Sequence, residues 1–171
     1  DSECRFFLAT VAVLIMVVSL NVFGAVYESL GQALRYGAFQ VVSIITTTGY
    51  ATADYEMWPA MSQIIILLCM FAGASAGSTG GGPKIMRIVV ILKNSTQELK
   101  RMIHPNAVIP VRVDGNAVSD TLVSGSVLYI AIYLTIALIS TLLLIIFGMN
   151  ITEAFSGTIA AMGNVGPGLG Q

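Results

Sequence analysis

The chain has 171 residues, of which 56% are apolar and 10% are charged, and its formal net charge at pH 7 is −1. A soluble domain usually carries about a quarter charged residues, and a soluble core of this size could not bury so much apolar surface, so the composition favours a lipid bilayer as the solvent and argues against an ordinary soluble domain. The near-zero net charge gives no basis for nucleic-acid binding, and the positions of Cys4 and Cys69 predict neither a disulfide nor a metal site.

The first predicted elements are a membrane span and a shorter helix. Residues 6–26 form an apolar run without charge, which is long enough for a span because a span needs about 20 residues. Residues 31–45 form a second helical stretch that would reach roughly 22 Å, too short to cross. It begins near Ser29 and Gln32, which have capping-box spacing, and it ends in threonine and glycine. These features predict a re-entrant pore helix that enters the membrane and turns back, with an amphipathic surface helix as the alternative.

A further apolar run, residues 59–72, leads into a glycine-rich segment. Since glycine lowers helix stability by about 1 kcal/mol per residue relative to alanine and Pro83 cannot continue a helix, we expect this span to break partway through the membrane. Irregular backbone at that depth is tolerated only inside protein or beside water. This predicts a flexible segment that faces a water-filled path, with a cytosolic linker after a complete span as the alternative. The segment consists of Gly73, Ala74, Ser75, Ala76, Gly77, Ser78, Thr79, Gly80, Gly81 and Gly82.

Charge predicts the orientation of the chain in the membrane. Residues 84–104 resume a helical pattern and residues 105–120 form a polar connection, with Asp114 and Gly115 at the turn of a short hairpin. Six of the eight basic residues lie between Lys84 and Arg112, so this region is predicted to be cytoplasmic. The acids on the opposite side would concentrate cations at an outer mouth by focusing the local field; they are Glu28, Asp54, Glu56 and Glu153.

The chain contains an internal repeat. Residues 121–147 form another uncharged span, and residues 150–162 repeat the short-helix pattern, with Asn150 and Glu153 at capping spacing. Both spans end in Phe-Gly, both short helices contain Ala-Phe, and both end at a glycine-containing turn. The unit is therefore span, pore helix, filter-like turn and span, and such repeats commonly surround a central pathway. Two units cannot close a fourfold pore, so we expect either two further units in a longer chain or a combination of two chains.

The two turns have the chemistry of a potassium filter. Backbone carbonyls can replace the water of a dehydrated potassium ion without a charge that would trap it, and glycine permits the dihedral angles that aim them at one axis. The preceding helix points its partly negative C-terminal end toward the cation. Neither turn contains a carboxylate of the kind that calcium sites collect. The predicted filter residues are Thr47, Thr48, Gly49 and Tyr50 in the first hairpin and Asn164, Val165 and Gly166 in the second.

These motifs resemble those of the Trk/Ktr/HKT superfamily of potassium transporters, most closely the bacterial Trk membrane subunit. The resemblance covers nearly the whole chain and is carried by residues 42–50, the glycine segment at residues 73–82, His104-Pro105 and residues 163–168. It implies an all-α membrane protein with span–pore-helix–span repeats and re-entrant filter hairpins, a voltage-gated-channel-like pore fold. Glycine at positions 49 and 166 fits potassium, because some relatives with serine in the filter favour sodium.

The resemblance also implies how the chain is organised. Residues 1–104 would be a repeat of the third type with its second span broken at a gate loop, residues 73–83. Residues 105–120 would be the cytosolic connection, and residues 121–171 the start of a fourth repeat. Because the chain begins at Asp1 and ends after a glycine-rich stretch, we expect a piece of a longer protein.

The expected function is potassium transport through a gated pore in the bacterial inner membrane. The implied partners are membrane lipid, a second copy of the protein in a homodimer and a cytosolic nucleotide-binding regulatory subunit of the Trk type; potassium is the transported ion and not a bound cofactor. A sodium or non-selective cation transporter of the same fold and a non-conducting assembly subunit are the alternatives. A membrane-embedded enzyme is disfavoured, because the single histidine, His104, lies in the cytosolic segment and no spanning run contains an acid.

Overall fold

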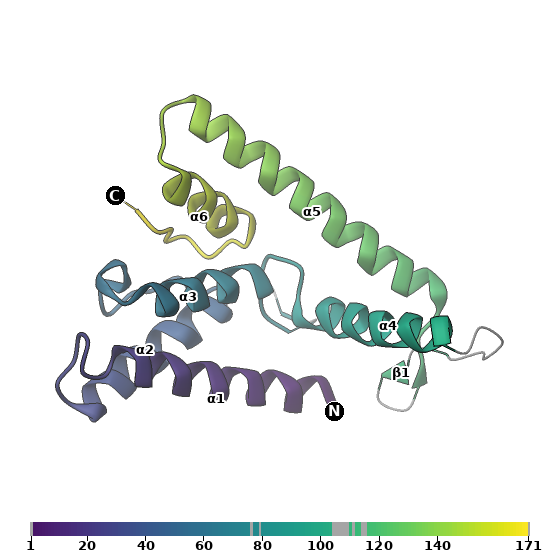
Figure 1. The fold of residues 1–171 in the computed structure, drawn as a ribbon, viewed down its shortest axis with the longest axis horizontal. Helices are drawn as coiled ribbons and strands as arrows, with labels where there is room; N and C mark the ends of the chain where they lie inside the picture. The colour runs from purple at the N-terminus through teal and green to yellow at the C-terminus, as the bar shows by residue number, and fades with distance from the viewer. Residues whose placement is uncertain are drawn as a thin grey trace.

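Helices account for most of the computed structural model, which describes residues 2–75, 77–78, 80–103, 110, 112–113 and 116–170. Figure 1 shows two helical hairpins, α1–α2 and α5–α6, placed on either side of α3, with α4 continuing beyond α3. The elements in chain order are α1 (Ser2–Val22), α2 (Leu30–Ile45), the 3-10 helix η1 (Tyr55–Met57), α3 (Ala60–Ala72), α4 (Ile85–Ile103), β1 (Arg112–Val113), β2 (Asn116–Ala117), α5 (Asp120–Ile146) and α6 (Ile151–Met162).

Two of these helices are long and apolar enough to cross a membrane, α1 over Cys4–Val22 and α5 over Asp120–Ile146. The prediction that the first span runs to residue 26 is wrong at its end, because α1 stops at Val22. Gly24 adopts a left-handed φ of 77°, and its N–H donates to the carbonyl of Tyr27 at 2.8 Å. This turn reverses the chain and leads directly into α2.

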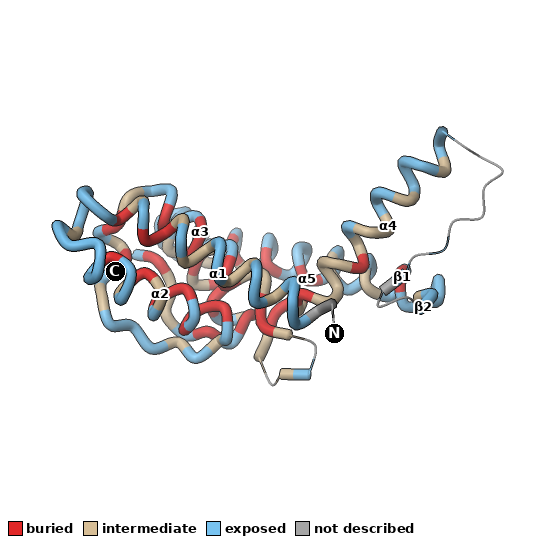
Figure 2. The backbone as a smooth tube through the Cα atoms, turned by 90° about the horizontal axis from the view of Figure 1, so that it is seen from below, coloured by how far each residue is buried: buried red, intermediate tan, exposed pale blue. Residues whose placement is uncertain are grey.

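Each short helix packs against the span that precedes it. Gly37 of α2 makes this possible in the first unit, because a Cβ at this position would lie 2.7 Å from the Oγ of Ser19 in α1. In lipid, close packing of this kind replaces the hydrophobic driving force between helices. The buried backbone in Figure 2 accordingly runs through α2, α3 and the inner sides of α1 and α5.

The two short helices begin differently. At α6 the predicted capping partners meet, since the Glu153 carboxylate accepts from the backbone N–H of Asn150 at 3.4 Å and from its side-chain amide at 2.9 Å. At α2 the N-cap is Ser29 as the spacing predicts, but its side chain makes no capping hydrogen bond. The first turn is held by the backbone instead, where Ala33 N–H donates to the Ser29 carbonyl at 3.0 Å.

The helix that follows η1 ends where the sequence predicts an interruption. Helix α3 ends at Ala72 after 13 residues, which corresponds to about 20 Å and is too short to cross. Gly73 follows with a φ of 68°, and helical structure resumes only at Ile85. Beyond the break, the first part of α4 packs against α5, with Val90 against Val123, and the C-terminal part of α4 extends away from the other helices (Figure 2).

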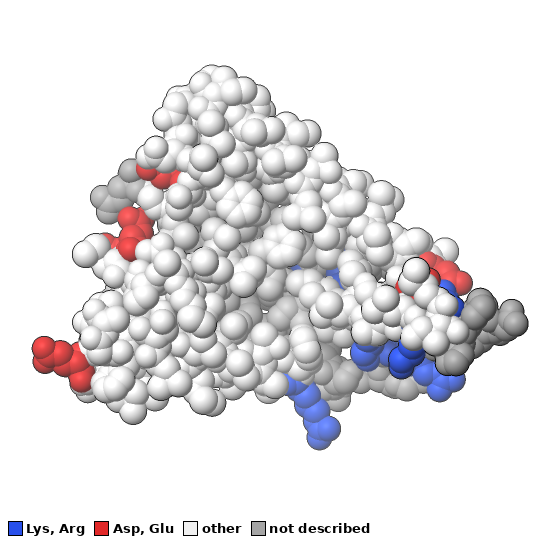
Figure 3. All heavy atoms as spheres, in the orientation of Figure 1, with Lys and Arg blue, Asp and Glu red and all other residues white. Residues whose placement is uncertain are grey.

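Charged side chains separate along the long axis of the molecule. In Figure 3 most acidic atoms gather at one end, where the loops before α2 and α6 and the η1 segment lie, and most basic atoms gather at the other end, around α4, together with a few acidic ones. The predicted hairpin in the connection is present as β1 and β2, which pair antiparallel with Arg112 opposite Ala117. His104, Pro105 and the expected turn residues Asp114 and Gly115 lie outside the described residues.

Candidate functional site

The first predicted hairpin leaves the end of α2 through a tight cap. Thr47 has a φ of 57°, which is uncommon for a residue with a side chain. Its N–H donates to the carbonyl of Ile44 at 3.0 Å, and the N–H of Thr48 donates to the carbonyl of Ser43 at 2.8 Å. This pair of bonds is a Schellman motif, which satisfies the last carbonyls of the helix and turns the chain back.

The second predicted hairpin repeats this cap at the end of α6. Asn164 has a φ of 54°, and its N–H donates to the carbonyl of Ala161 at 3.1 Å. The N–H of Val165 donates to the carbonyl of Ala160 at 2.9 Å. A glycine with positive φ follows two residues after each left-handed residue, Gly49 at 77° and Gly166 at 106°. The repeat inferred from the sequence therefore extends to individual dihedral angles and hydrogen bonds.

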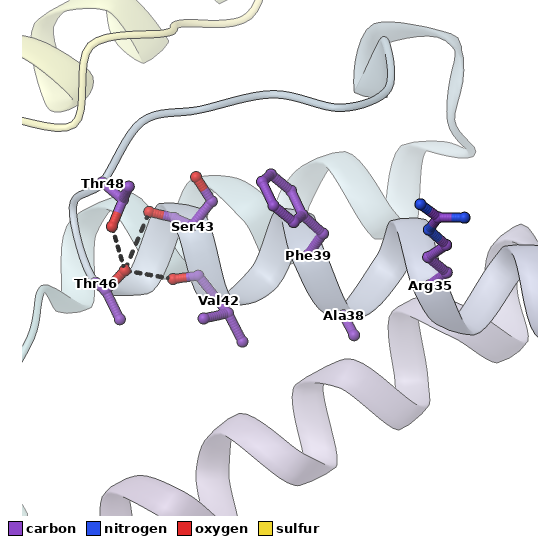
Figure 4. Close-up of a pocket in the computed structure, with 7 residues that line it drawn as sticks. All are labelled: Arg35, Ala38, Phe39, Val42, Ser43, Thr46 and Thr48. Atoms are coloured by element: carbon purple, nitrogen blue, oxygen red, sulfur yellow. Dashed lines mark hydrogen bonds between the residues drawn. The ribbon is translucent and has the colours of Figure 1, made fainter.

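Hydroxyl groups of α2 tie down the chain after the first cap. The Oγ of Ser43 donates to the carbonyl of Tyr50 at 2.6 Å, so the Tyr50 oxygen is turned back toward α2 while its ring is exposed. Thr46 donates through its hydroxyl to the Val42 carbonyl at 2.7 Å and lies 2.9 Å from the hydroxyl of Thr48. Figure 4 shows these groups at one end of an apolar groove of about 430 Å³ along α2, with Phe39 and Arg35 farther along the helix.

The two hairpins meet at a glycine. A Cβ built on Gly49 would collide with the carbonyl oxygen of Val165 and would lie 3.4 Å from the ring of Pro167. The collision is with backbone, so no side-chain rotation could relieve it, and the positive φ of Gly49 adds strain for any other residue. Residues more than a hundred positions apart thus lie side by side with their backbones in contact.

The chain after the second hairpin is held from two sides. On one side, Ser156 of α6 donates from its Oγ to the carbonyl of Leu169 at 2.7 Å and accepts from the N–H of Leu169 at 2.9 Å. On the other side, the Tyr55 hydroxyl donates to the carbonyl of Gly168 at 2.8 Å, and the Glu56 carboxylate accepts from the N–H of Gly170 at 2.8 Å. The sequence did not predict these hydrogen bonds. Only those made by Ser156 have a signal in the sequence, a serine in each pore helix.

The glycine-rich segment lies directly against both hairpins. A Cβ on Gly80 would lie 2.8 Å from the hydroxyl of Thr47. A Cβ on Gly81 would lie 2.5 Å from the carbonyl oxygen of Gly163, at the start of the second hairpin. Absence of side chains is therefore what allows the segment to approach the two turns. Ala76 and Thr79, also predicted for the gate loop, lie outside the described residues.

Contacts from later in the chain also reach this segment. The Lys84 ammonium donates to the carbonyl of Ser78 at 2.9 Å, and the hydroxyl of Tyr129 in α5 donates to the carbonyl of Gly82 at 3.3 Å. Near its start, the carbonyl of Ala74 accepts from the N–H of Ile85 at 3.3 Å. Gly73 and Gly82, with φ of 68° and 77°, bend the chain at its two ends.

The arrangement offers neutral oxygen ligands and no carboxylate cage. Within the part of the chain that the structure describes, no group of three or more His, Cys, Asp or Glu side chains could hold a metal ion. Both pore helices direct their C-terminal ends, which carry partial negative charge, at the hairpins. Thr48, Asn164 and Gly166 remain exposed on the hairpins. Such a site suits a weakly held monovalent cation better than a divalent one.

Comparison with known proteins gives concordant results. All residues, 1–171, match the family model TrkH, described as a cation transport protein. The chain is 34% identical over 171 residues to the Trk system potassium uptake protein TrkH of Salmonella typhimurium and 36% identical over 172 residues to the protein of that name from Halomonas elongata. It covers 35% and 36% of these relatives, so it spans about a third of their length.

A solved structure shares the fold. The crystal structure of the potassium transporter TrkH from Vibrio parahaemolyticus matches with a TM-score of 0.92 and 36% sequence identity. The match covers 100% of this chain and 37% of that one. The fold as a whole thus agrees with a crystal structure, which supports the channel-like pore fold predicted from the repeats.

Proposed function

The chain belongs to the TrkH family of cation transport proteins, and from this premise we propose that the protein containing it takes up potassium, and rubidium, across the bacterial inner membrane, either passively or driven by a gradient. The observation that carries the proposal is the meeting of two identically capped hairpins at Gly49 and Val165. The family is one of transporters and not of enzymes, so the membrane-embedded enzyme is set aside.

The two hairpins form two of the walls of a selectivity filter in this proposal. Backbone carbonyls of Thr47, Thr48 and Gly49 face an ion together with those of Asn164, Val165 and Gly166. Tyr50 contributes least, since its carbonyl already accepts the hydroxyl of Ser43. Neutral carbonyls in a water-poor site compensate the ion for lost hydration without binding it too tightly to leave.

Potassium is favoured over other cations by two independent arguments. The relatives named above are potassium uptake proteins, and neither hairpin carries a carboxylate. Four acidic residues lie instead around the outer end, in the loop before α2, at η1 and at the start of α6. There they raise the local concentration of cations without trapping them in the filter.

The glycine-rich segment is the gate in this proposal. It contacts the inner side of both hairpins through Gly80 and Gly81, where a shift of backbone would open or close the path. Its glycines permit such a shift at little steric cost. The segment sits between two helices, α3 and α4, so a movement of α4 on the cytoplasmic side would be transmitted to it directly.

Completion of the pore needs protein beyond this chain. Two hairpins leave the pathway open on one side, and the exposed apolar groove along α2 (Figure 4) is a surface that the missing part of the protein would cover in our assignment. We assign the chain to a third repeat and the start of a fourth, in a protein that works as a homodimer with a cytosolic nucleotide-binding regulator. The names of the relatives, which describe a Trk system, support a multicomponent assembly.

Rubidium uptake into proteoliposomes tests this function. The full-length protein is expected to accumulate rubidium and to prefer it over sodium, and Gly49→Ser is expected to lower uptake at least about tenfold, since a non-glycine residue here adds roughly 1–3 kcal/mol of backbone strain besides the collision. Gly125→Ser is the matched control, because a Cβ at Gly125 in α5 meets nothing within 4 Å.

Two results would overturn the proposal. If the wild type takes up no monovalent cation under any gating condition, the alternative of a non-conducting assembly subunit would be favoured. Uptake without preference for rubidium over sodium would leave a sodium or non-selective transporter of the same fold.

A further inference from the structure

The η1 segment belongs to the first unit, and hydrogen bonds within that unit hold it in place. The carboxylate of Asp54 accepts from the N–H of Glu56 at 3.0 Å. The side-chain amide of Gln63 in α3 donates to the carbonyl of Glu56 at 2.6 Å and to that of Trp58 at 3.0 Å. Tyr55 is only 5% exposed. Tyr55 and Glu56, the two residues that contact the second unit, therefore lie in a segment whose backbone is fixed by these hydrogen bonds.

Tyr55 and Glu56 bind alternate residues of the irregular segment that leaves the second hairpin. The Tyr55 hydroxyl binds the carbonyl of Gly168, and the Glu56 carboxylate binds the N–H of Gly170, both at 2.8 Å. The intervening residue, Leu169, faces the other way and is bonded through both of its backbone groups to Ser156. Residues 168–170 are thus hydrogen-bonded on both sides, by Ser156 of their own unit and by Tyr55 and Glu56 of the other.

Gly166 itself has few packing contacts that fix its position. It is exposed, and a Cβ at this position would meet nothing within 4 Å. Its carbonyl position therefore depends on the anchored residues on either side, the cap at Asn164 and Val165 and the segment at residues 168–170. A change in the second anchor moves Gly166 without altering any group of the hairpin itself.

We propose that Tyr55 and Glu56 form an inter-unit clamp, which positions the second hairpin relative to the first and thereby sets the preference among monovalent cations. They are positioning residues, since they act on the filter through the backbone of residues 168–170 and do not touch the ion. The proposal rests on the proposed function for its effect on selectivity, whereas the clamp itself is a property of the fold.

The two halves of the clamp have opposite chemistry. Tyr55 donates, and it keeps its proton because burial, followed by the negative charges of Glu56 and Asp54, raises its pKa to about 12. Glu56 accepts, so any side chain that presents an oxygen at the same place can replace it. A neutral acceptor in place of Glu56 would therefore keep the hydrogen bond and remove the charge. The two effects must be separated because the charge also acts on cations near the outer end.

Selectivity measurements on the full-length protein in proteoliposomes test the clamp. Glu56→Ala and Tyr55→Phe are each expected to lower the rubidium-over-sodium preference about 2- to 10-fold, the equivalent of one lost hydrogen bond. Glu56→Gln is expected to retain the preference, because its amide oxygen still accepts from Gly170. Glu28→Ala removes another acid from the same end and is expected to leave the preference unchanged, since it has no contact with residues 168–170 in the structure.

Amide hydrogen exchange gives a second readout that does not depend on transport. In the full-length protein, a peptide covering residues 165–170 is expected to exchange faster in Glu56→Ala than in wild type or Glu56→Gln. Equal exchange in all three proteins would show that the clamp does not hold residues 168–170.

The transport results separate the two proposals. An unchanged preference in both Glu56→Ala and Tyr55→Phe, in a wild type that transports rubidium, would overturn the role in selectivity while leaving the proposed function intact. An equal loss of preference in Glu56→Gln and Glu56→Ala would assign the effect to charge and would also overturn the clamp. A wild type that transports no monovalent cation would instead refute the proposed function, and with it the selectivity role, while hydrogen exchange would still decide whether the clamp exists.

Discussion

The two hairpins and the glycine-rich segment lie against each other but are held in different ways. Each hairpin leaves its helix through a cap with two backbone hydrogen bonds, and serine hydroxyls of the pore helices bond to the chain that follows. The segment between α3 and α4 touches the hairpins through glycine backbone at Gly80 and Gly81. The hairpins are thus fixed by caps and side-chain hydroxyls, whereas the segment is anchored by hydrogen bonds from Lys84, Ile85 and Tyr129 and meets the hairpins through glycine backbone.

This difference suggests a division of labour. Discrimination between ions requires carbonyls whose positions are maintained, and gating requires backbone that can move past them. Placing the two tasks on adjacent but separate stretches of chain allows one to move while the other stays fixed. Changes in the segment should therefore alter how much is transported, and changes in the hairpins should alter which ion is transported.

Among the changes that test this division of labour, shortening the glycine-rich segment should have the largest effect on rubidium uptake. Deletion of residues 74–81 removes the backbone that packs on the hairpins at Gly80 and Gly81 and is expected to raise rubidium uptake about tenfold, the effect of lowering a barrier by about 1.4 kcal/mol. The rubidium-over-sodium preference should stay at the wild-type value, because both caps remain. Both quantities are measured together in proteoliposomes.

A deletion of equal length in the connection at residues 105–120 controls for loss of chain. Uptake equal to that of the wild type after deletion of residues 74–81 would remove the gating assignment. A lost preference would show that the segment also maintains the filter and would break the division of labour.

Removing one hydroxyl from the fixed region should have a much smaller effect. Ser43→Ala loses the 2.6 Å bond to the Tyr50 carbonyl, for which a typical net contribution is about 1 kcal/mol. The midpoint of thermal unfolding of the full-length protein in detergent is expected to fall by an amount of the order of 1 °C, with uptake largely maintained. Ser95→Ala, on the exposed face of α4, is the matched control and should not lower the midpoint. A midpoint unchanged by Ser43→Ala would mean that the cap alone fixes the first hairpin.

Local features of the fold were predictable from the sequence. The pore helix expected at residues 31–45 is observed as Leu30–Ile45, because its glycine and threonine boundaries are encoded in neighbouring residues. The interruption after Ala72 was likewise evident from the density of glycine and from Pro83. The end of α1 was misplaced, since apolar composition continues past Val22 and only the conformation of Gly24 ends the helix.

Contacts between the units were not predictable in the same way. The bonds from Tyr55 and Glu56 to Gly168 and Gly170 join residues 113 and 114 positions apart. In the sequence, both side chains are those of an ordinary membrane–water interface. Their second role depends on how the two units pack, which no local pattern specifies.

The most direct test of the central claim is to locate the ion. Crystals of the full-length protein grown with thallium or rubidium should show anomalous scattering between the two hairpins, surrounded by carbonyl oxygens of residues 47–49 and 164–166. A peak in this position, lost in Gly49→Ser, is the predicted result. An ion bound only by carboxylates elsewhere, with none between the hairpins, would contradict the account.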